Sequence, residues 1–151
     1  WALTDGWGKK HSLADYAGKP VIVIFYLGKG CAHCIEQLSA FAPEVDRFKQ
    51  AGIDLVAIST DHIGGLLETF QLNQNKPFPF PLLSDASLEV FKQYRAHDDF
   101  EKQPLHGTFL IDRAGLVRWQ DISYEPFQEV EFLLNESKRL LAQDPPQVTK
   151  R

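Results

Sequence analysis

Two cysteines three positions apart, Cys31 and Cys34, are the residues of this chain best suited to chemistry. They are the only cysteines among 151 residues, and Ala32 and His33 stand between them. In a helix, residues three apart are neighbours at a Cβ distance of about 5–6 Å, close to what a disulfide accepts. The thiolate form of cysteine attacks both disulfides and peroxides. The spacing therefore predicts a redox-active dithiol.

Three other interpretations of the pair stay open. A structural disulfide is one, although so small a ring removes little entropy from the unfolded chain. Half of a zinc site is another, with His62, His97 or His106 adding ligands, although no second ligand pair has zinc-like spacing. Two inert buried thiols are the third, although the neighbouring glycines indicate exposure. We expect redox activity, with no metal site and no bound cofactor.

The pair falls where a strand passes into a helix. Residues 21–26 form a continuous β-branched and aromatic run, which is typical of a strand covered on both faces. A helix is predicted over 31–50, with a bend at Pro43 and with apolar residues every three or four positions at Ile35, Leu38, Phe41, Val45 and Phe48. The unpaired N–H groups at the start of this helix favour a thiolate over a thiol.

The rest of the chain reads as alternating strands and helices. The expected elements are a hairpin over 1–12, a helical turn over 13–16, a strand over 53–59, helices over 63–73 and 87–94, an antiparallel pair over 108–112 and 116–120, and a last helix that buries Val130, Leu133, Leu134, Ser137 and Leu141. This order predicts an α/β protein with a central mixed sheet, helices on both faces and an N-terminal hairpin extension. We expect one domain over 1–143 and a flexible tail over 144–151.

Composition excludes several classes of protein. Hydrophobic residues make up 44% of the chain and charged residues 24%, the balance of a globular domain. A net charge of -4 argues against nucleic-acid binding, which needs a basic face. The longest apolar run, over 21–27, is too short to span a membrane. The chain starts at Trp1 and has no methionine, so we expect that a signal peptide, anchor or upstream domain was removed, and no compartment is predicted.

Five segments spread over nearly the whole chain carry a resemblance to a known family: Leu13-Ala14-Asp15-Tyr16-Ala17-Gly18-Lys19-Pro20, Phe25-Tyr26-Leu27, Ile58-Ser59-Thr60-Asp61, Phe80-Pro81-Leu82-Leu83-Ser84-Asp85 and Gly107-Thr108-Phe109-Leu110-Ile111-Asp112-Arg113-Ala114-Gly115. Together they resemble the redoxin branch of the thioredoxin superfamily. This branch contains peroxiredoxins of the AhpC/TSA type and TlpA-like thiol-disulfide oxidoreductases. The resemblance implies a thioredoxin fold and an antioxidant or thiol-exchanging enzyme.

The resemblance to peroxiredoxins is incomplete at the site. Those proteins carry a Pro-x-x-x-Thr-x-x-Cys loop and a later arginine. Here Leu27 replaces the proline, Cys31 replaces the threonine, and Cys34 takes the place of the peroxide-attacking cysteine. His106 stands at the arginine position, which is also where thioredoxin-like proteins have a cis-proline.

Two histidines are expected to support the cysteines. His33 precedes the second cysteine as in the oxidising protein DsbA, which implies that it stabilises the reduced thiolate and makes the disulfide a better oxidant. His106 is expected either to assist proton transfer or to fill the space of the arginine. Structural roles are expected for the others: surface positions for His11, His62 and His97, and turns or caps for Asp61 and Asp112.

The sequence thus predicts a thiol-disulfide oxidoreductase in which Cys31 attacks and Cys34 closes the disulfide. Its partner is an external thiol reductant or a protein disulfide. One alternative is a thiol peroxidase that reduces hydrogen or alkyl peroxides through Cys34, with Cys31 as the resolving cysteine. Another is a redox-inert interaction domain.

Overall fold

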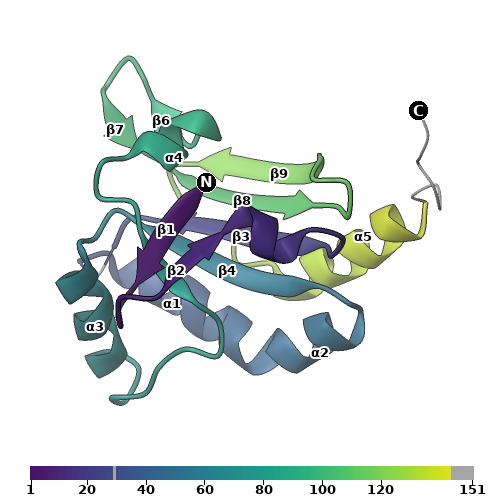
Figure 1. Cartoon of the computed structure of the whole chain (residues 1–151), viewed down its shortest axis with the longest axis horizontal. Helices are drawn as coiled ribbons and strands as arrows, with labels where there is room; N and C mark the ends of the chain where they lie inside the picture. Colours follow the sequence, from purple (N-terminus) through teal and green to yellow (C-terminus); the bar gives the residue numbers. More distant parts are fainter. Residues whose placement is uncertain (29, 144–151) are drawn as a thin grey trace.

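One seven-stranded mixed sheet runs through the molecule in the order β2-β1-β5-β4-β3-β8-β9 (Figure 1). The computed structural model describes residues 1–28 and 30–143. The strands of this sheet are β1 (Ala2–Asp5), β2 (Lys10–Ser12), β3 (Val21–Tyr26), β4 (Asp54–Ser59), β5 (Leu82–Ser84), β8 (His106–Ile111) and β9 (Val117–Ser123). The helices are α1 (Ala32–Phe41), α2 (Val45–Gln50), α3 (Ile63–Gln71), α4 (Glu89–Gln93) and α5 (Val130–Ala142), with 3-10 turns η1 (Leu13–Tyr16) and η2 (Ala42–Glu44).

Strand β3 is the centre of the sheet and leads directly to the cysteines. It pairs in parallel with β4 and antiparallel with β8, and all six of its residues are completely buried. Its alternate side chains enter two separate cores. Ile22, Ile24 and Tyr26 pack in the core formed with α1, α2 and α5, and Val21, Val23 and Phe25 pack in the core formed with α4. The predicted strand, covered on both faces, is confirmed.

The predicted helix over 31–50 is interrupted rather than merely bent. Helix α1 ends at Phe41, the 3-10 turn η2 holds Pro43, and α2 then begins at Val45. Proline lacks the N–H that would continue the α-helical hydrogen bonds, so the chain tightens into a 3-10 turn at this point. The apolar stripe survives the interruption, because Leu38, Phe41 and Phe48 are all buried in one core.

Three short strands were missed by periodicity. Strand β5 has only three residues, yet it joins the sheet by pairing in parallel with β4 and antiparallel with β1. The N-terminal hairpin β1–β2 therefore continues the sheet as its edge. Strands β6 (His97–Asp98) and β7 (Gln103–Pro104) form a separate ribbon. Strands of two or three residues are too short for an alternating pattern to be recognised.

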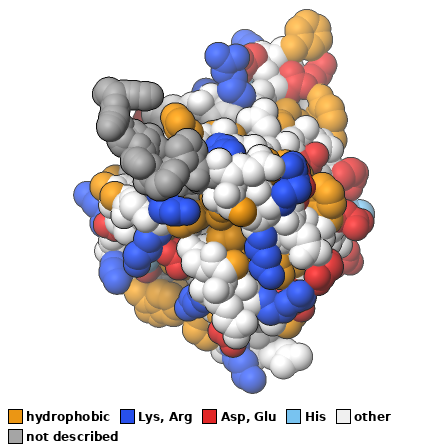
Figure 2. All heavy atoms as spheres, turned by 90° about the vertical axis from the view of Figure 1, so that its right-hand side faces the viewer, with side chains coloured by type: hydrophobic (Ala, Val, Ile, Leu, Met, Phe, Trp, Pro, Cys, Tyr) orange, Lys and Arg blue, Asp and Glu red, His pale blue; other side chains and the backbone are white. Residues whose placement is uncertain are grey.

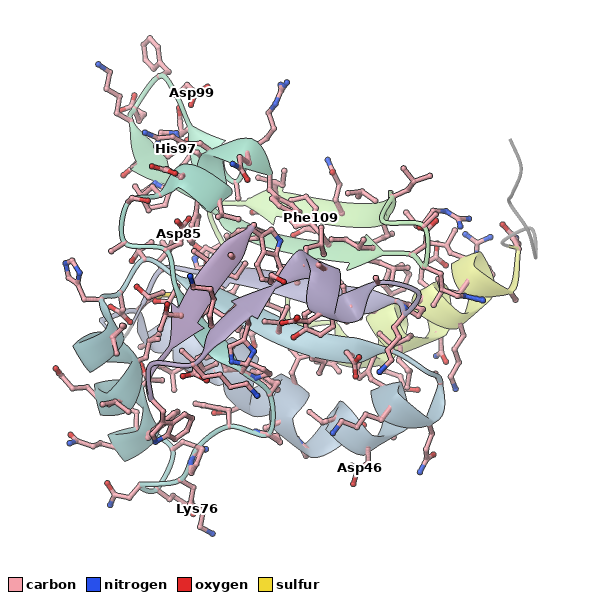
Figure 3. The ribbon with its side chains drawn as sticks, viewed as in Figure 1. Asp46, Lys76, Asp85, His97, Asp99 and Phe109 are labelled. Carbon is pink, nitrogen blue, oxygen red and sulfur yellow. A yellow bond between two sulfur atoms is a disulfide. The ribbon has the colours of Figure 1, made fainter. Side chains whose placement is uncertain are left out.

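Two of the three histidines expected on the surface lie elsewhere. His62 is exposed, as predicted. His97 is not, because its side chain is only 6% exposed and pairs with Asp99 at 2.9 Å in the β6–β7 ribbon (Figure 3). His11 is half-buried, and its Nε2 lies 2.8 Å from a carboxylate oxygen of Asp5. Both imidazoles have an aspartate partner, but the Asp5 partner of His11 is largely buried whereas the Asp99 partner of His97 is 91% exposed.

Buried aspartates close several of the turns. Asp112 accepts hydrogen bonds from the backbone N–H groups of Ala114 and Leu116, which confirms its predicted turn role. Asp85 accepts hydrogen bonds from the backbone N–H groups of Val90 and Phe91, at the start of α4. Both aspartates thus pair backbone donors that the turns leave open.

Charged and apolar side chains are mixed on one face of the molecule (Figure 2). On the face shown in Figure 2, Lys and Arg side chains lie among acidic and apolar ones rather than in one continuous patch. Across the described residues, no helix is long and apolar enough to cross a membrane. The expected tail over 144–151 lies outside those residues, so the division into domain and tail stays a prediction.

Candidate redox site

Cys31 and Cys34 are joined by a disulfide at the start of α1, with their Cα atoms 5.2 Å apart. Cys31 is the N-cap residue in an extended conformation, and Cys34 lies in the first turn of the helix. The backbone N–H of Cys34 donates to the Cys31 sulfur at 3.3 Å. This N–H also donates to the Cys31 carbonyl at 3.1 Å, so it is shared between that oxygen and the sulfur that would carry the charge of a thiolate.

The two sulfurs differ sharply in exposure. Cys34 is 0% exposed, whereas Cys31 is partly exposed at the helix start. Cys34 packs in the same core as Leu38 and Tyr26, and Cys31 contacts that core only from its edge. A large substrate can therefore reach Cys31 but not Cys34 while the disulfide is closed.

The residue after β3, Leu27, fixes the position of the buried sulfur. Its backbone N–H donates to the Cys34 Sγ at 3.3 Å. Its backbone carbonyl accepts a hydrogen bond from the Thr60 hydroxyl at 2.9 Å. Thr60 follows β4, the parallel neighbour of β3, so the sheet itself holds the turn in place. Apart from its place in a family segment, no local pattern in the sequence indicates this role for Thr60.

A glycine is required in the turn that precedes the cysteines. Gly28 has φ +107°, and a Cβ at this position would lie 2.7 Å from a carboxylate oxygen of Asp61. Gly65 in α3 approaches the same side chain, with a Cβ position 2.9 Å from the Asp61 Cβ. Asp61 thus packs between the turn before α1 and the start of α3, in the bend that closes β4. Its expected structural role as a turn residue is confirmed.

His106 is the residue of β8 that lies against the disulfide. It is 4% exposed, and its Nδ1 and Nε2 lie 3.7 and 4.0 Å from the Cys34 Sγ. Burial lowers the pKa of His106; Glu125 opposes this shift by its negative charge, and His33 adds to it. A neutral imidazole beside a thiol can accept the proton of that thiol.

His33 lies outside this buried cluster. Its side chain is 65% exposed and its Nδ1 lies 3.4 Å from a carboxylate oxygen of Glu125, which follows β9. Glu125 was not singled out from the sequence, because nothing in the spacing links residues 33 and 125. His33 and Glu125 thus lie on the solvent-exposed side of the site, and His106 lies on its buried side.

Of the three histidines considered as further zinc ligands, the fold brings His106 to the two cysteines. The ligand atoms of Cys31, Cys34 and His106 all lie within 4.8 Å of one another. The third ligand comes from β8, 72 positions after Cys34, so no ligand spacing along the chain indicates it.

The chain is similar to known proteins over most of its length. The sequence profile of the AhpC/TSA family matches residues 1–120. The chain belongs to the AhpC/TSA family. Among its relatives are the chloroplastic peroxiredoxin Q of Suaeda salsa, 35% identical over 119 residues, and that of Sedum lineare, 34% identical over 120 residues. Both matches cover 78% of this chain, and they cover 54% and 62% of those relatives. The chain thus spans little more than half the length of curated relatives that it matches.

Solved structures confirm the thioredoxin fold of this AhpC/TSA member. Peroxidoxin BcpB of Mycobacterium tuberculosis superposes with a TM-score of 0.80 at 22% identity, covering 96% of this chain and 94% of the other. Peroxiredoxin Q of Xanthomonas campestris superposes with a TM-score of 0.77 at 23% identity, covering 92% and 90%. The predicted mixed sheet flanked by helices is therefore correct.

The buried position of His106 gives the first prediction. Because the pKa of His106 in the folded protein is below the unfolded value of about 6.5, the unfolded chain binds the proton more readily. This contribution to stability is complete above about pH 6.5 and is lost as the pH falls through the folded-state pKa. His106→Gln should therefore weaken the loss of stability that the oxidised protein shows between pH 7.5 and 5, measured by urea unfolding.

The matched control is His62→Gln, which changes an exposed histidine. It should leave the pH dependence as in the wild type. Equal pH dependence in wild type and His106→Gln would show that His106 is not held neutral by burial.

The second prediction concerns His33. If its positive charge favours the thiolate, His33→Ala should lower the reduction potential of the pair. Because His33 is largely exposed and has Glu125 beside it, solvent and this carboxylate screen the effect, so we expect a decrease of less than about 30 mV, which is a tenfold change in the exchange constant. A glutathione titration measures it, and Glu125→Gln should shift the potential in the opposite direction. An unchanged reduction potential in both variants would show that the charges of His33 and Glu125 do not influence the disulfide.

Proposed function

We propose that this chain is a thiol-disulfide oxidoreductase that cycles between a Cys31–Cys34 dithiol and the disulfide. The observation that carries this proposal is the asymmetry of the bonded pair. Cys31 is reachable at a helix start, while Cys34 is sealed between the Leu27 N–H and His106. An exposed nucleophile with a buried second sulfur is what stepwise disulfide exchange requires.

In the first step the Cys31 thiolate attacks one sulfur of a substrate disulfide. The substrate S–S bond breaks, one of its halves leaves as a thiolate, and the other half forms a mixed disulfide with Cys31. The Cys34 N–H that faces the Cys31 sulfur, together with the positive end of the α1 dipole, stabilises the attacking charge.

In the second step Cys34 closes the ring. Neutral His106 accepts the proton of the Cys34 thiol across the 3.7 Å contact. The Cys34 thiolate then attacks the Cys31 sulfur and releases the remaining substrate half as a thiolate. The Leu27 N–H supports the charge on Cys34 until the new bond forms. The protein has then lost two electrons to the substrate. The proton held by His106 passes to one released thiolate, and the other thiolate takes a proton from solvent, matching the one that Cys31 gave up when its thiolate formed.

The reverse sequence regenerates the dithiol. An external dithiol attacks Cys31, because this is the sulfur within reach, and Cys34 is the leaving group. The partners of the proposed cycle are therefore a protein or small-molecule disulfide on one side and a thiol reductant on the other.

A second candidate is supported by a specific contact. Cys34 takes the place of the peroxide-attacking cysteine of the family, and the Leu27 N–H donates to its sulfur. Relatives of this chain carry the name peroxiredoxin Q. In this reaction the Cys34 thiolate would take one oxygen from a peroxide, giving a sulfenic acid and an alcohol or water, and Cys31 would displace water to form the disulfide.

The third prediction separates the two candidates. A peroxidase stabilises the charge that develops along the S–O–O axis, and the loss of one preorganised donor costs on the order of a hundredfold in rate. Here His106 and Cys31 stand at the arginine and threonine positions. Reduced protein should therefore react faster with a small disulfide than with hydrogen peroxide in stopped-flow mixing, and His106→Arg should speed the peroxide reaction while slowing disulfide exchange.

His62→Arg adds the same charge at an exposed site and should change neither rate. Rapid peroxide consumption by the wild type, or no gain in His106→Arg, would favour the peroxidase. Failure of the two thiols to become labelled after reduction would instead favour the redox-inert interaction domain.

A further inference from the structure

Three potential metal ligands of the softer kind converge at the start of α1. The sulfurs of Cys31 and Cys34 and a ring nitrogen of His106 lie within 4.8 Å of one another. Cys34 and His106 are buried, and Cys31 is partly exposed. Among the described residues, these three form the one group of at least three Cys, His, Asp or Glu side chains that lie close enough to share an ion.

We propose that the reduced protein binds one Zn²⁺ through Cys31, Cys34 and His106, with an exchangeable fourth ligand on the exposed side. Disulfide formation and zinc binding use the same two sulfurs, so they exclude each other. The inference goes beyond the proposed function and needs only that the disulfide can be opened by a chemical reductant.

The distance between the Cys34 sulfur and the His106 ring suits a tetrahedral ion. With Zn–S about 2.3 Å and Zn–N about 2.0–2.1 Å, a tetrahedral angle places sulfur and nitrogen about 3.6 Å apart. The Cys34 Sγ and the His106 Nδ1 are already 3.7 Å apart. Neither buried ligand needs to move far, so the site is largely preformed on its buried side.

Only the Cys31 side chain must change position. In a tetrahedral site two sulfurs lie about 3.8 Å apart, further than in a disulfide. Cys31 is the N-cap of α1 and partly exposed, so its side chain can turn away from Cys34 when the bond opens. The Cα separation of 5.2 Å already allows both sulfurs to bind the same ion.

The surroundings favour the ion over two bare thiolates. The charge of Zn²⁺ balances two thiolates, so the closed side of the site holds no net charge. The Leu27 N–H donates to the sulfur of Cys34, the cysteine that need not move, and such an outer hydrogen bond orients a thiolate ligand. Thiolate and imidazole ligands select zinc over calcium or magnesium.

The consequence is a competition between metal binding and thiol exchange. A zinc-bound Cys31 is held away from attack on a substrate. When a disulfide of a partner takes two electrons from the two sulfurs, the Cys31–Cys34 bond forms and Zn²⁺ leaves without any change in its own oxidation state.

The test is a titration of Zn²⁺ against a chromogenic zinc chelator, with protein that was reduced and freed of reductant under nitrogen. We expect one Zn²⁺ per reduced chain and at least a tenfold weaker affinity after oxidation. His106→Gln, checked for folding by circular dichroism and for its ability to form the disulfide, should bind at least tenfold more weakly than wild type. His62→Gln should bind like wild type.

Equal zinc affinity in His106→Gln and wild type would overturn the proposal, as would equal affinity in the reduced and oxidised forms. Binding is measured at equilibrium without turnover, so its outcome is independent of the exchange assay. Zinc bound by a protein that exchanges no disulfide would support this inference while contradicting the proposed function.

Discussion

The burial of Cys34 beneath the turn that joins β3 to α1 is the constraint on which the rest of the site depends. The Leu27 N–H contacts its sulfur from the turn after β3, and the ring of His106 contacts it from β8. Because the sulfur is closed off on this side, Cys31 is the only one of the pair with access to solvent. The order of attack, the need for a base inside the site and the convergence of three ligands all follow from that single placement.

The sheet explains why this placement is stable. Strand β3 is buried on both faces, and its neighbours β4 and β8 deliver Thr60 and His106 to the same end of the sheet. The close approach of Gly28 to Asp61 ties the turn to the start of α3. Each contact with the cysteines therefore rests on backbone that the sheet already holds, so the site requires little ordering when a substrate arrives.

The sequence was informative wherever a pattern is local. The run over 21–26 and the apolar stripe continued through Phe48 each reflect neighbours along the chain, and the strand and the buried stripe that they predict are confirmed. The cysteine spacing is equally local and places the two sulfurs at disulfide distance, while the redox activity it indicates stays a prediction. Contacts between residues far apart along the chain produce no such local pattern. The hydrogen bond from Thr60, the pairing of His33 with Glu125 and the burial of His97 depend on tertiary packing, and β5 is too short to show alternation. Family likeness named the position of His106, but only packing brings it to the sulfur of Cys34.

The most direct test of the account is to trap the first covalent intermediate. Reduced Cys34→Ser and Cys31→Ser are each mixed with a small disulfide, and the adducts are followed by mass spectrometry over time. We expect Cys34→Ser to form a lasting mixed disulfide at Cys31 quickly, and Cys31→Ser to react much more slowly because its remaining sulfur is buried. A faster adduct at Cys34 would assign the attack to the buried sulfur and overturn the proposed order of attack.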